Sequence, residues 1–199
     1  GELEEDVLSS SLRRGGTARL VRRGHGEAQM ANGDRYLGSW AEDVPHGQGA
    51  YTYELEAQVY EGAWVHGERH GYGELHSTAA ADTLDEYKGQ WRYDMRCGQG
   101  VQRLGASGDV LTGLWVQDAL CGHGTLTTGR GDVYEGGFVA SLRDGQGRCV
   151  YADGSVYEGG WQAGMYEGKG TLVGVGGARC EGSWHRGEMS GAGRRVYGG

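Results

Sequence analysis

A Gly-x-Gly triplet recurs along almost the whole chain, and this repeat constrains the fold more than any other feature. The triplets begin at Gly24, Gly47, Gly71, Gly98, Gly122, Gly145, Gly168 and Gly191. Between them runs a second pattern, Tyr-x-Gly-x-Trp, and its last position holds all six tryptophans and the only phenylalanine. A period of about 23 residues indicates tandem copies of one supersecondary unit rather than a single globular core.

The spacings inside the repeat separate a rigid connection from a variable one. From Trp or Phe to the next triplet the distance is seven residues in all seven cases, whereas from a triplet to the next Tyr position it varies from 12 to 16. The third residue after each aromatic is Asp, Ser or Gly, which suit tight turns and left-handed conformations. Apolar residues alternate with polar ones in both segments, which is typical of strands. Each repeat is therefore predicted to be strand, variable turn, strand and fixed link.

Glycine supplies 42 of the 199 residues and proline only one, which argues against several fold classes. Collagen and proline-rich disorder do not fit this composition. Helices are disfavoured because each interior glycine costs roughly 1 kcal/mol relative to alanine. Glycine in a strand is tolerated where an aromatic from a neighbouring strand covers it, so we expect each indole to lie flat over a glycine floor.

The net charge of -8 argues against nucleic-acid binding, which depends on clustered Lys and Arg. No apolar run reaches the roughly 20 residues of a membrane-spanning helix, so we expect a soluble segment, cut from a longer protein. The four cysteines predict a reducing, cytoplasmic setting. Cys97 and Cys121, like His46 and His70, occupy equivalent positions in adjacent repeats. Two strand spacings would hold each pair roughly 10 Å apart, too far for a disulfide or a directly shared metal.

Tyr157-Glu158-Gly159-Gly160-Trp161 followed by Gly168-Lys169-Gly170 closely resembles the MORN repeat (membrane occupation and recognition nexus). The resemblance covers residues 24–199, as about seven repeats and the start of an eighth. Residues 13–23 look like a degenerate half repeat that acts as a cap, and residues 1–12 are expected to be a tail. The resemblance implies an all-β fold, an elongated single-layer twisted antiparallel sheet of tandem β-hairpins. About 15 strands at roughly 4.8 Å spacing would give a rod of roughly 70 Å.

A one-layer sheet has no second layer to cover its aromatic face, so we expect that face to curl on itself or to accept a partner. The first hypothesis is a scaffold that binds a peptide, a helix or a second copy of the chain along an aromatic groove, because Trp and Tyr are common interface anchors. The alternative role for the same side chains is the repeat's own core. The candidate residues are Tyr36, Trp40, Tyr60, Trp64, Tyr87, Trp91, Trp115, Tyr134, Phe138, Tyr157, Trp161 and Trp184.

The second hypothesis is binding to phosphoinositides or other anionic membrane lipids, the property for which the family was named. Anionic headgroups require clustered positive charge. The cluster nearest this requirement is Arg13, Arg14, Arg19, Arg22 and Arg23. The resemblance also allows a regulatory repeat region of a larger signalling protein. In each case we expect a cytoplasmic module associated with the cytoskeleton, a cilium or a membrane.

Catalysis is not expected from these residues. His66 and His70 lack the His-Glu-x-x-His order of a zinc protease, and no triplet continues into a phosphate-binding loop. MORN repeats do occur fused to enzyme domains, but the chemistry then lies outside the repeats. We therefore predict no catalytic residues, no cofactor and no resident metal, and leave open a metal at a contact between two copies.

Overall fold

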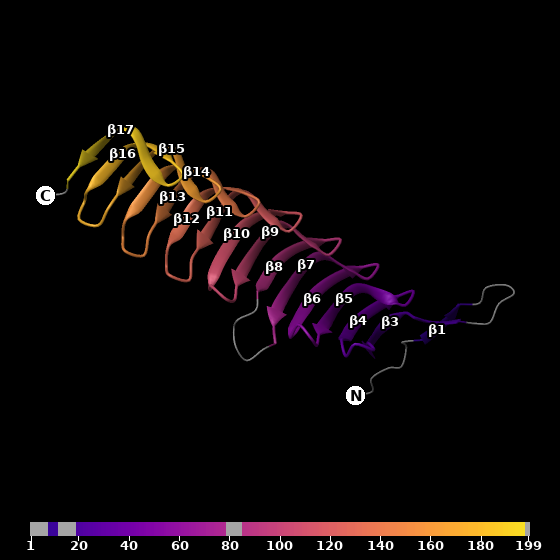
Figure 1. Cartoon of the computed structure of the whole chain (residues 1–199). Helices are drawn as coiled ribbons and strands as arrows, with labels where there is room; N and C mark the ends of the chain where they lie inside the picture. Colours follow the sequence, from indigo (N-terminus) through magenta and orange to yellow (C-terminus); the bar gives the residue numbers. More distant parts are fainter. Residues whose placement is uncertain (1–7, 12–18, 79–84, 198–199) are drawn as a thin grey trace. The chain divides into compact units, whose positions relative to one another are not determined.

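The structure is a computed structural model and describes residues 8–11, 19–78 and 85–197. These residues form seventeen strands and no helix. Strands β3–β17 form one antiparallel sheet in chain order, and β1 and β2 form a separate two-stranded sheet (Figure 1). The predicted all-β fold, a single sheet of consecutive hairpins, is confirmed, and the elongated shape remains a prediction.

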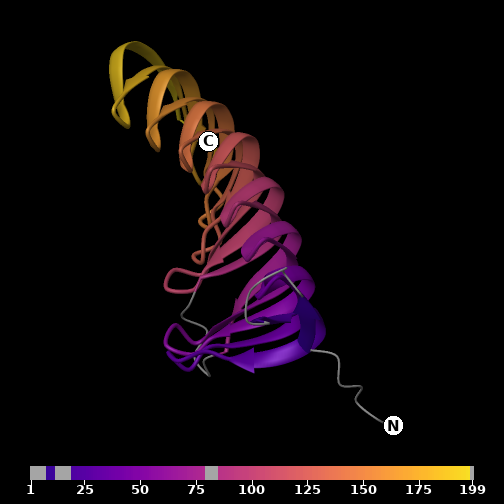
Figure 2. The ribbon, with the colours of Figure 1, turned by 90° about the vertical axis from the view of Figure 1, so that its right-hand side faces the viewer.

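The chain divides into two compact units, Gly1–Met95 and Arg96–Gly199. The first unit contains β1 (Leu8–Ser11), β2 (Arg19–Arg22), β3 (Gly24–Gln29), β4 (Arg35–Ala41), β5 (Val44–Tyr53), β6 (Gln58–Val65), β7 (Glu68–Ser77) and β8 (Glu86–Arg92). The second contains β9 (Met95–Leu104), which begins at the boundary, β10 (Asp109–Val116), β11 (Ala119–Thr127), β12 (Val133–Val139), β13 (Leu142–Val150), β14 (Val156–Gln162), β15 (Met165–Val173), β16 (Arg179–His185) and β17 (Glu188–Val196). Strands within each unit are strongly curved (Figure 2).

Strand β1 lies within the segment predicted to be a tail and pairs with β2, so part of that segment is ordered into a hairpin. Residues 1–7 and 12–18 lie outside the described residues. The predicted boundaries of the tail and of the capping half repeat, at residues 12 and 23, therefore stay predictions.

Each fixed link contains a two-residue turn in which both residues have positive φ. In the link between β4 and β5 these are Glu42 (φ 51°) and Asp43 (φ 71°), and in the link between β14 and β15 they are Ala163 (φ 47°) and Gly164 (φ 83°). Two successive left-handed residues define a type I′ turn, whose twist matches that of the flanking strands. The second turn residue is the Asp, Ser or Gly noted in the sequence, so its predicted left-handed conformation is confirmed.

The first glycine of each triplet has a role that alternation alone does not show. All eight have positive φ, between 58° at Gly98 and 85° at Gly145. On β5, Pro45 pairs with Trp40 but Gly49 pairs with Gly38, so four steps along β5 correspond to two along β4. The extra residues form a bulge, and its left-handed position favours glycine. The constant distance of seven residues therefore contains a turn and a bulge.

The second glycine of each triplet and the glycine of each Tyr-x-Gly-x-Trp pattern stand directly opposite one another on successive strands. In the first unit Gly38 pairs with Gly49, Gly49 with Gly62, and Gly62 with Gly73. The second unit continues the same pattern from Gly100 on β9 to Gly193 on β17. Each unit thus contains a row of glycines that crosses its strands at one level.

Tyrosine rings, rather than the expected indoles, cover most of these glycines, whereas Leu120 and Phe138 contact Gly124. A Cβ atom on Gly49 would collide with the phenol of Tyr36, and one on Gly38 would lie 2.6 Å from the Tyr36 oxygen. The hydroxyl of Tyr36 donates to the Ser39 carbonyl at 2.9 Å, which holds the ring across the row. The expectation of an indole over a glycine floor is therefore wrong, because each tyrosine ring reaches forward along its own strand, over the glycine two residues later and the glycine paired with it.

The indoles instead donate hydrogen bonds to the preceding strand, on the other side of the variable turn. The Nε1–H of Trp64 donates to the Gly49 carbonyl at 3.1 Å, and that of Trp161 donates to Gly147 at 3.2 Å. The same bond forms at Trp40, Trp91, Trp115 and Trp184. Each tryptophan satisfies its only donor on the second glycine of the preceding triplet, so its polar group is not left unpaired in the core.

Candidate interaction surfaces

The twelve aromatic residues predicted to line a partner groove lie in the core of the sheet. Their exposed fractions run from 0% at Tyr36, Tyr60 and Tyr157 to 7% at Trp184. Within a repeat, Tyr and Trp or Phe pack edge to face, with ring centroids 4.9 Å apart for Tyr36 and Trp40 and 5.2 Å apart for Tyr157 and Trp161. These residues stabilise the sheet, and their contact with a partner stays a prediction.

Burial also sets the protonation of the core phenols. It raises the pKa of Tyr36, Tyr134 and Tyr157 to about 12, because a charged phenolate is poorly solvated there. Each hydroxyl donates to a carbonyl three residues along its own strand. A tyrosinate could not make this bond, so the neutral phenol is the form that the fold uses.

Arginine side chains cover the indoles from the neighbouring repeat, a role that the sequence analysis did not identify. The guanidinium of Arg69 lies 4.3 Å from the ring centre of Trp91, that of Arg96 4.7 Å from Trp115, and that of Arg143 4.2 Å from Trp161. Each arginine stands two residues after a link turn. Stacking of this kind stabilises by about 0.5–2 kcal/mol, depending on exposure.

An aspartate in the next link turn holds two of these arginines in place. The Asp94 carboxylate accepts the backbone N–H of Arg69 at 2.9 Å and its Nε–H at 3.0 Å. Asp118 holds Arg96 with the same two bonds, at 2.9 and 3.0 Å. In both cases the second guanidinium nitrogen donates to the aspartate's own carbonyl, at 3.0 and 2.9 Å. We call this arrangement the link clamp.

A second set of aspartates fixes the variable hairpin tips. Asp34 is only 5% exposed and accepts hydrogen bonds from the Tyr51 hydroxyl at 2.9 Å, the Glu54 N–H at 3.0 Å and the Asn32 amide at 2.8 Å. Burial by itself raises the pKa of Asp34, but these three hydrogen bonds outweigh it and lower the pKa. Asp132 accepts the Ala152 N–H in the same way. These carboxylates therefore have a structural role.

The face opposite the aromatics carries a strip of exposed apolar side chains in the second unit. It consists of Leu114, Val116, Val139, Leu142 and Met165, with exposed fractions between 41% and 60%. Val139 pairs directly with Leu142 across the link turn. Successive links are joined by the Ser141 N–H to Leu120 carbonyl and Gly164 N–H to Arg143 carbonyl hydrogen bonds. The members from Val116 to Met165 thus lie on consecutive links, and we call the set the apolar strip.

The arginines proposed for lipid binding are described only in part. Arg13, Arg14 and the side chain of Arg19 lie outside the part of the chain that the structure describes. Arg22 makes an ion pair with Asp43 at 3.6 Å, and Arg23 makes one with Glu42 at 3.5 Å. Lipid binding stays a prediction, and two of its five arginines already have acidic partners.

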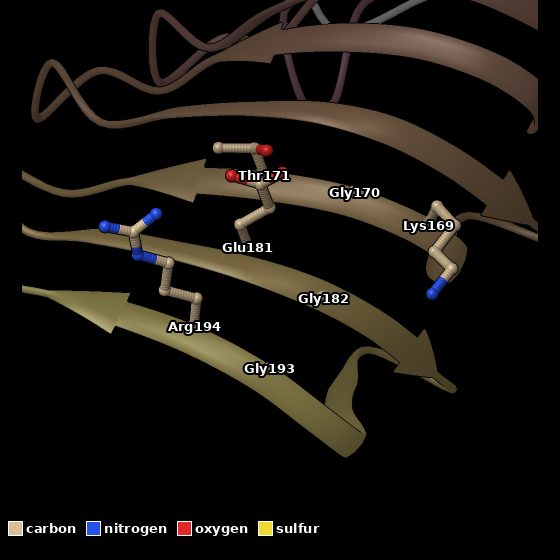
Figure 3. A pocket seen from close by; sticks show the side chains of 7 residues that line it. All are labelled: Lys169, Gly170, Thr171, Glu181, Gly182, Gly193 and Arg194. Atoms are coloured by element: carbon tan, nitrogen blue, oxygen red, sulfur yellow. The ribbon is translucent and has the colours of Figure 1, made fainter.

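A hollow of about 600 Å³ lies over β15–β17, lined by Lys169, Thr171, Glu181 and Arg194 and by the glycine row (Figure 3). Figure 3 shows Lys169 well separated from the other three side chains. The hollow mixes charges of both signs, because its lining includes Glu181 as well as Lys169 and Arg194, and Glu181 is also paired with Arg179 outside it at 3.2 Å. This mixture gives no preference for a particular ligand charge.

Metal-binding and redox residues are scattered through the described part of the chain. All four cysteines are free, and no three His, Cys, Asp or Glu side chains there are grouped as a metal site would require. His46 and His66 lie near each other, with ring centroids 5.5 Å apart. No helix in residues 8–11, 19–78 or 85–197 has the length and hydropathy of a membrane span.

Comparisons with known proteins agree with this architecture. The MORN repeat family model matches residues 36–54, 60–78, 87–105, 112–133, 134–156, 157–179 and 180–198. Alsin from Rattus norvegicus is 33% identical over 130 residues, which is 61% of this chain and 7% of alsin. MORN repeat-containing protein 3 from Xenopus laevis is 35% identical over 72 residues, covering 35% of this chain and 30% of that protein. The chain thus spans less than a third of either relative.

Among solved structures, the SAS-4 (dCPAP) TCP domain of Drosophila melanogaster, in complex with a proline-rich motif of Ana2 (dSTIL), aligns with 80% of this chain and 78% of its own. The TM-score is 0.36 and the sequence identity 11%, too low to support an argument about fold or function. The family model, in contrast, matches most of the chain in seven consecutive units, each containing one Gly-x-Trp or Gly-x-Phe segment and one triplet. The chain belongs to the MORN-repeat family.

Proposed function

We propose that this chain is a non-catalytic MORN-repeat scaffold that binds a segment of a partner protein, or a second copy of itself, in a cytoplasmic assembly attached to the cytoskeleton, a cilium or a membrane. Membership of a repeat family that serves as an interaction module supports the general role. The apolar strip is the observation that carries the more specific proposal, because contiguous exposed apolar side chains on a soluble surface mark interaction sites.

The aromatic face is a second surface on which a partner could bind, but its exposed side chains differ from those expected. The twelve aromatics are at most 7% exposed, so a partner on that face would first meet the side chains that cover them. The side chain of Arg69 is 20% exposed and that of Arg96 is 21% exposed. These arginines, rather than the indoles, would make the initial contact.

The test replaces two strip residues without changing net charge. The double variant Val139→Glu with Leu142→Lys places opposite charges at a directly paired position, which cross-strand pairing tolerates. Because both side chains are more than half exposed, we expect the unfolding midpoint to stay within about 0.5 kcal/mol of the parent. Self-association by light scattering and partner capture quantified by mass spectrometry should both be compared with the parent chain.

A matched control is Leu37→Gln, which removes an aliphatic side chain of 52% exposure from the first unit. Loss of a partner or of dimer mass in the double variant, with retention in the control, supports the strip. Unchanged capture and unchanged molar mass in the double variant would rule the strip out. A loss seen only after Arg69→Gln would place the partner on the aromatic face.

A further inference from the structure

The position two residues after the link turn recurs in every repeat, and comparing these positions shows one arginine, Arg143, that has no aspartate in the next turn. In the complete clamps the arginine two residues after a turn donates its backbone N–H and Nε–H to an aspartate in the next turn. In one repeat Leu120 stands at the arginine position and Ser141 at the aspartate position. The Ser141 hydroxyl accepts the backbone N–H of Leu120 at 2.9 Å. In another repeat Pro45 stands at the arginine position. Proline has no backbone N–H, so the glycine in the next turn, Gly67, leaves no donor without an acceptor.

Arg143 has a backbone N–H and a guanidinium but no side-chain acceptor for them in the next turn, because the residue there is Gly164, which has no side chain. Its guanidinium nevertheless adopts the clamp position. One terminal nitrogen donates to the Gly164 carbonyl at 2.8 Å, compared with 3.0 and 2.9 Å in the complete clamps. The guanidinium carbon lies 4.2 Å from the ring centre of Trp161. The corresponding distances in the complete clamps are 4.3 Å for Arg69 and 4.7 Å for Arg96. The cation is therefore held as in the complete clamps, and only the carboxylate is missing.

The space in which the missing aspartate side chain would begin is open. A Cβ atom added to Gly164 would have no heavy atom within 4 Å, apart from its chain neighbours. Among residues 19–78 and 85–197, none of the ion pairs with a carboxylate involves Arg143. The Cys149 side chain makes a hydrogen bond with the guanidinium, but sulfur is a weak acceptor that a carboxylate would outcompete. Asp144, the next residue, accepts the Ala163 N–H at 3.3 Å, so its charge is close but it does not occupy this space.

We propose that the open space beside Arg143 and Gly164 is a binding seat for a carboxylate from an acidic side chain of a partner protein. The carboxylate would accept the Nε–H and backbone N–H of Arg143, as Asp94 and Asp118 do in the complete clamps. Charge-assisted hydrogen bonds of this kind are the stronger ones in proteins. The identity of the occupant rests on the proposed function, whereas the seat itself rests on Arg143 and Gly164.

The first experiment tests the seat with acetate at constant ionic strength, observed by nitrogen-15 NMR of arginine Nε–H and backbone N–H groups. We expect saturable shifts at Arg143 and none of similar size at Arg69 or Arg96, whose seats are filled. Gly164→Asp supplies an internal carboxylate and should abolish the acetate shifts. Equal shifts at all three arginines, equal shifts with chloride, or persistence in Gly164→Asp would each overturn the seat.

Thermal unfolding gives a second readout with a matched control. Gly164→Asp should raise the unfolding midpoint, since Asp94 and Asp118 adopt φ values of 62° and 67° in the same turn position. Gly187→Asp is the control, because the residue facing it is Tyr166, which offers a backbone N–H but no guanidinium, so its gain should be smaller. A midpoint for Gly164→Asp no higher than that for Gly187→Asp would contradict the missing-carboxylate interpretation.

The third experiment separates a protein carboxylate from a small one. A short peptide with one aspartate should shift Arg143 at concentrations about tenfold lower than the same peptide with asparagine, the ratio expected for losing a charge-assisted bond. Acetate binding without this difference would mean a small-anion site only and overturn the protein occupant. A partner captured equally by the parent chain and Gly164→Asp would overturn the assignment but leave the proposed function intact. Acetate binding at Arg143 together with no captured partner would support the seat but contradict the proposed function.

Discussion

At the scale of single residues, glycine and tyrosine act as one unit in this sheet. The row of paired glycines leaves no Cβ atoms at one level, and the phenol of Tyr134 occupies that level against Gly136 and Gly147. Its hydroxyl then closes a hydrogen bond to the Gly137 carbonyl at 2.9 Å. An aromatic side chain can lie this close to a strand only where the strand has no side chain of its own.

Gly147→Ala should therefore destabilise the chain by about 1–3 kcal/mol, the usual cost of forcing a group into a packed core. The added methyl would overlap the Tyr134 ring, and Tyr134 is only 1% exposed and has little room to move. Gly174→Ala is the control, since its nearest atom would be 3.7 Å away. Equal denaturation midpoints for the two variants in urea would refute the packing argument.

At the scale of the element, the link turn and the bulge after it fix the register of each hairpin. Every turn uses two left-handed residues, and the first of them is never glycine: alanine at position 163, for example, has φ 47°. Left-handed φ costs an L-residue roughly 1–2 kcal/mol, and asparagine tolerates it best among non-glycine residues. Several turns thus carry strain that the neighbouring clamp contacts must offset.

Ala163→Asn should stabilise the chain by about 0.5–1 kcal/mol, because Asn-Gly is the preferred pair for a type I′ turn. The comparison is Ala178→Asn, at an exposed position outside the positive-φ set. We expect a higher denaturation midpoint for the first variant and little change for the second. A lower denaturation midpoint for Ala163→Asn than for the parent chain would show that side-chain contacts, rather than backbone preference, determine the turn.

At the scale of the whole molecule, stability comes from many equivalent contacts between neighbouring repeats rather than from one central core. Each unit repeats the same tyrosine, tryptophan and glycine contacts from hairpin to hairpin. Conditions that affect one such contact should affect all of them together, as in other repeat proteins whose stability is a sum of neighbour terms.

Alkaline pH should act on this set of contacts. Burial raises the pKa of Tyr36, Tyr134 and Tyr157 from 10.0 to about 12, so the folded state favours the neutral phenol. Their contribution to stability is complete below the unfolded-state pKa near 10 and is lost as the pH rises toward 12. We expect the urea midpoint to fall across this window, in parallel with phenolate absorbance. A flat midpoint through the window would contradict the linkage.

The sequence alone determined the period, the strands, the left-handed link turns and the family resemblance, because each of these depends on residues close together in the chain. Tertiary structure decided which side chain covers the glycines, because alternation places Tyr and Trp on one face but does not say which way a ring leans. It also decided that the twelve aromatics form a core and that arginine and aspartate from different repeats meet. Arg69 and Asp94 are 25 residues apart, and only strand pairing with its bulges brings them into contact.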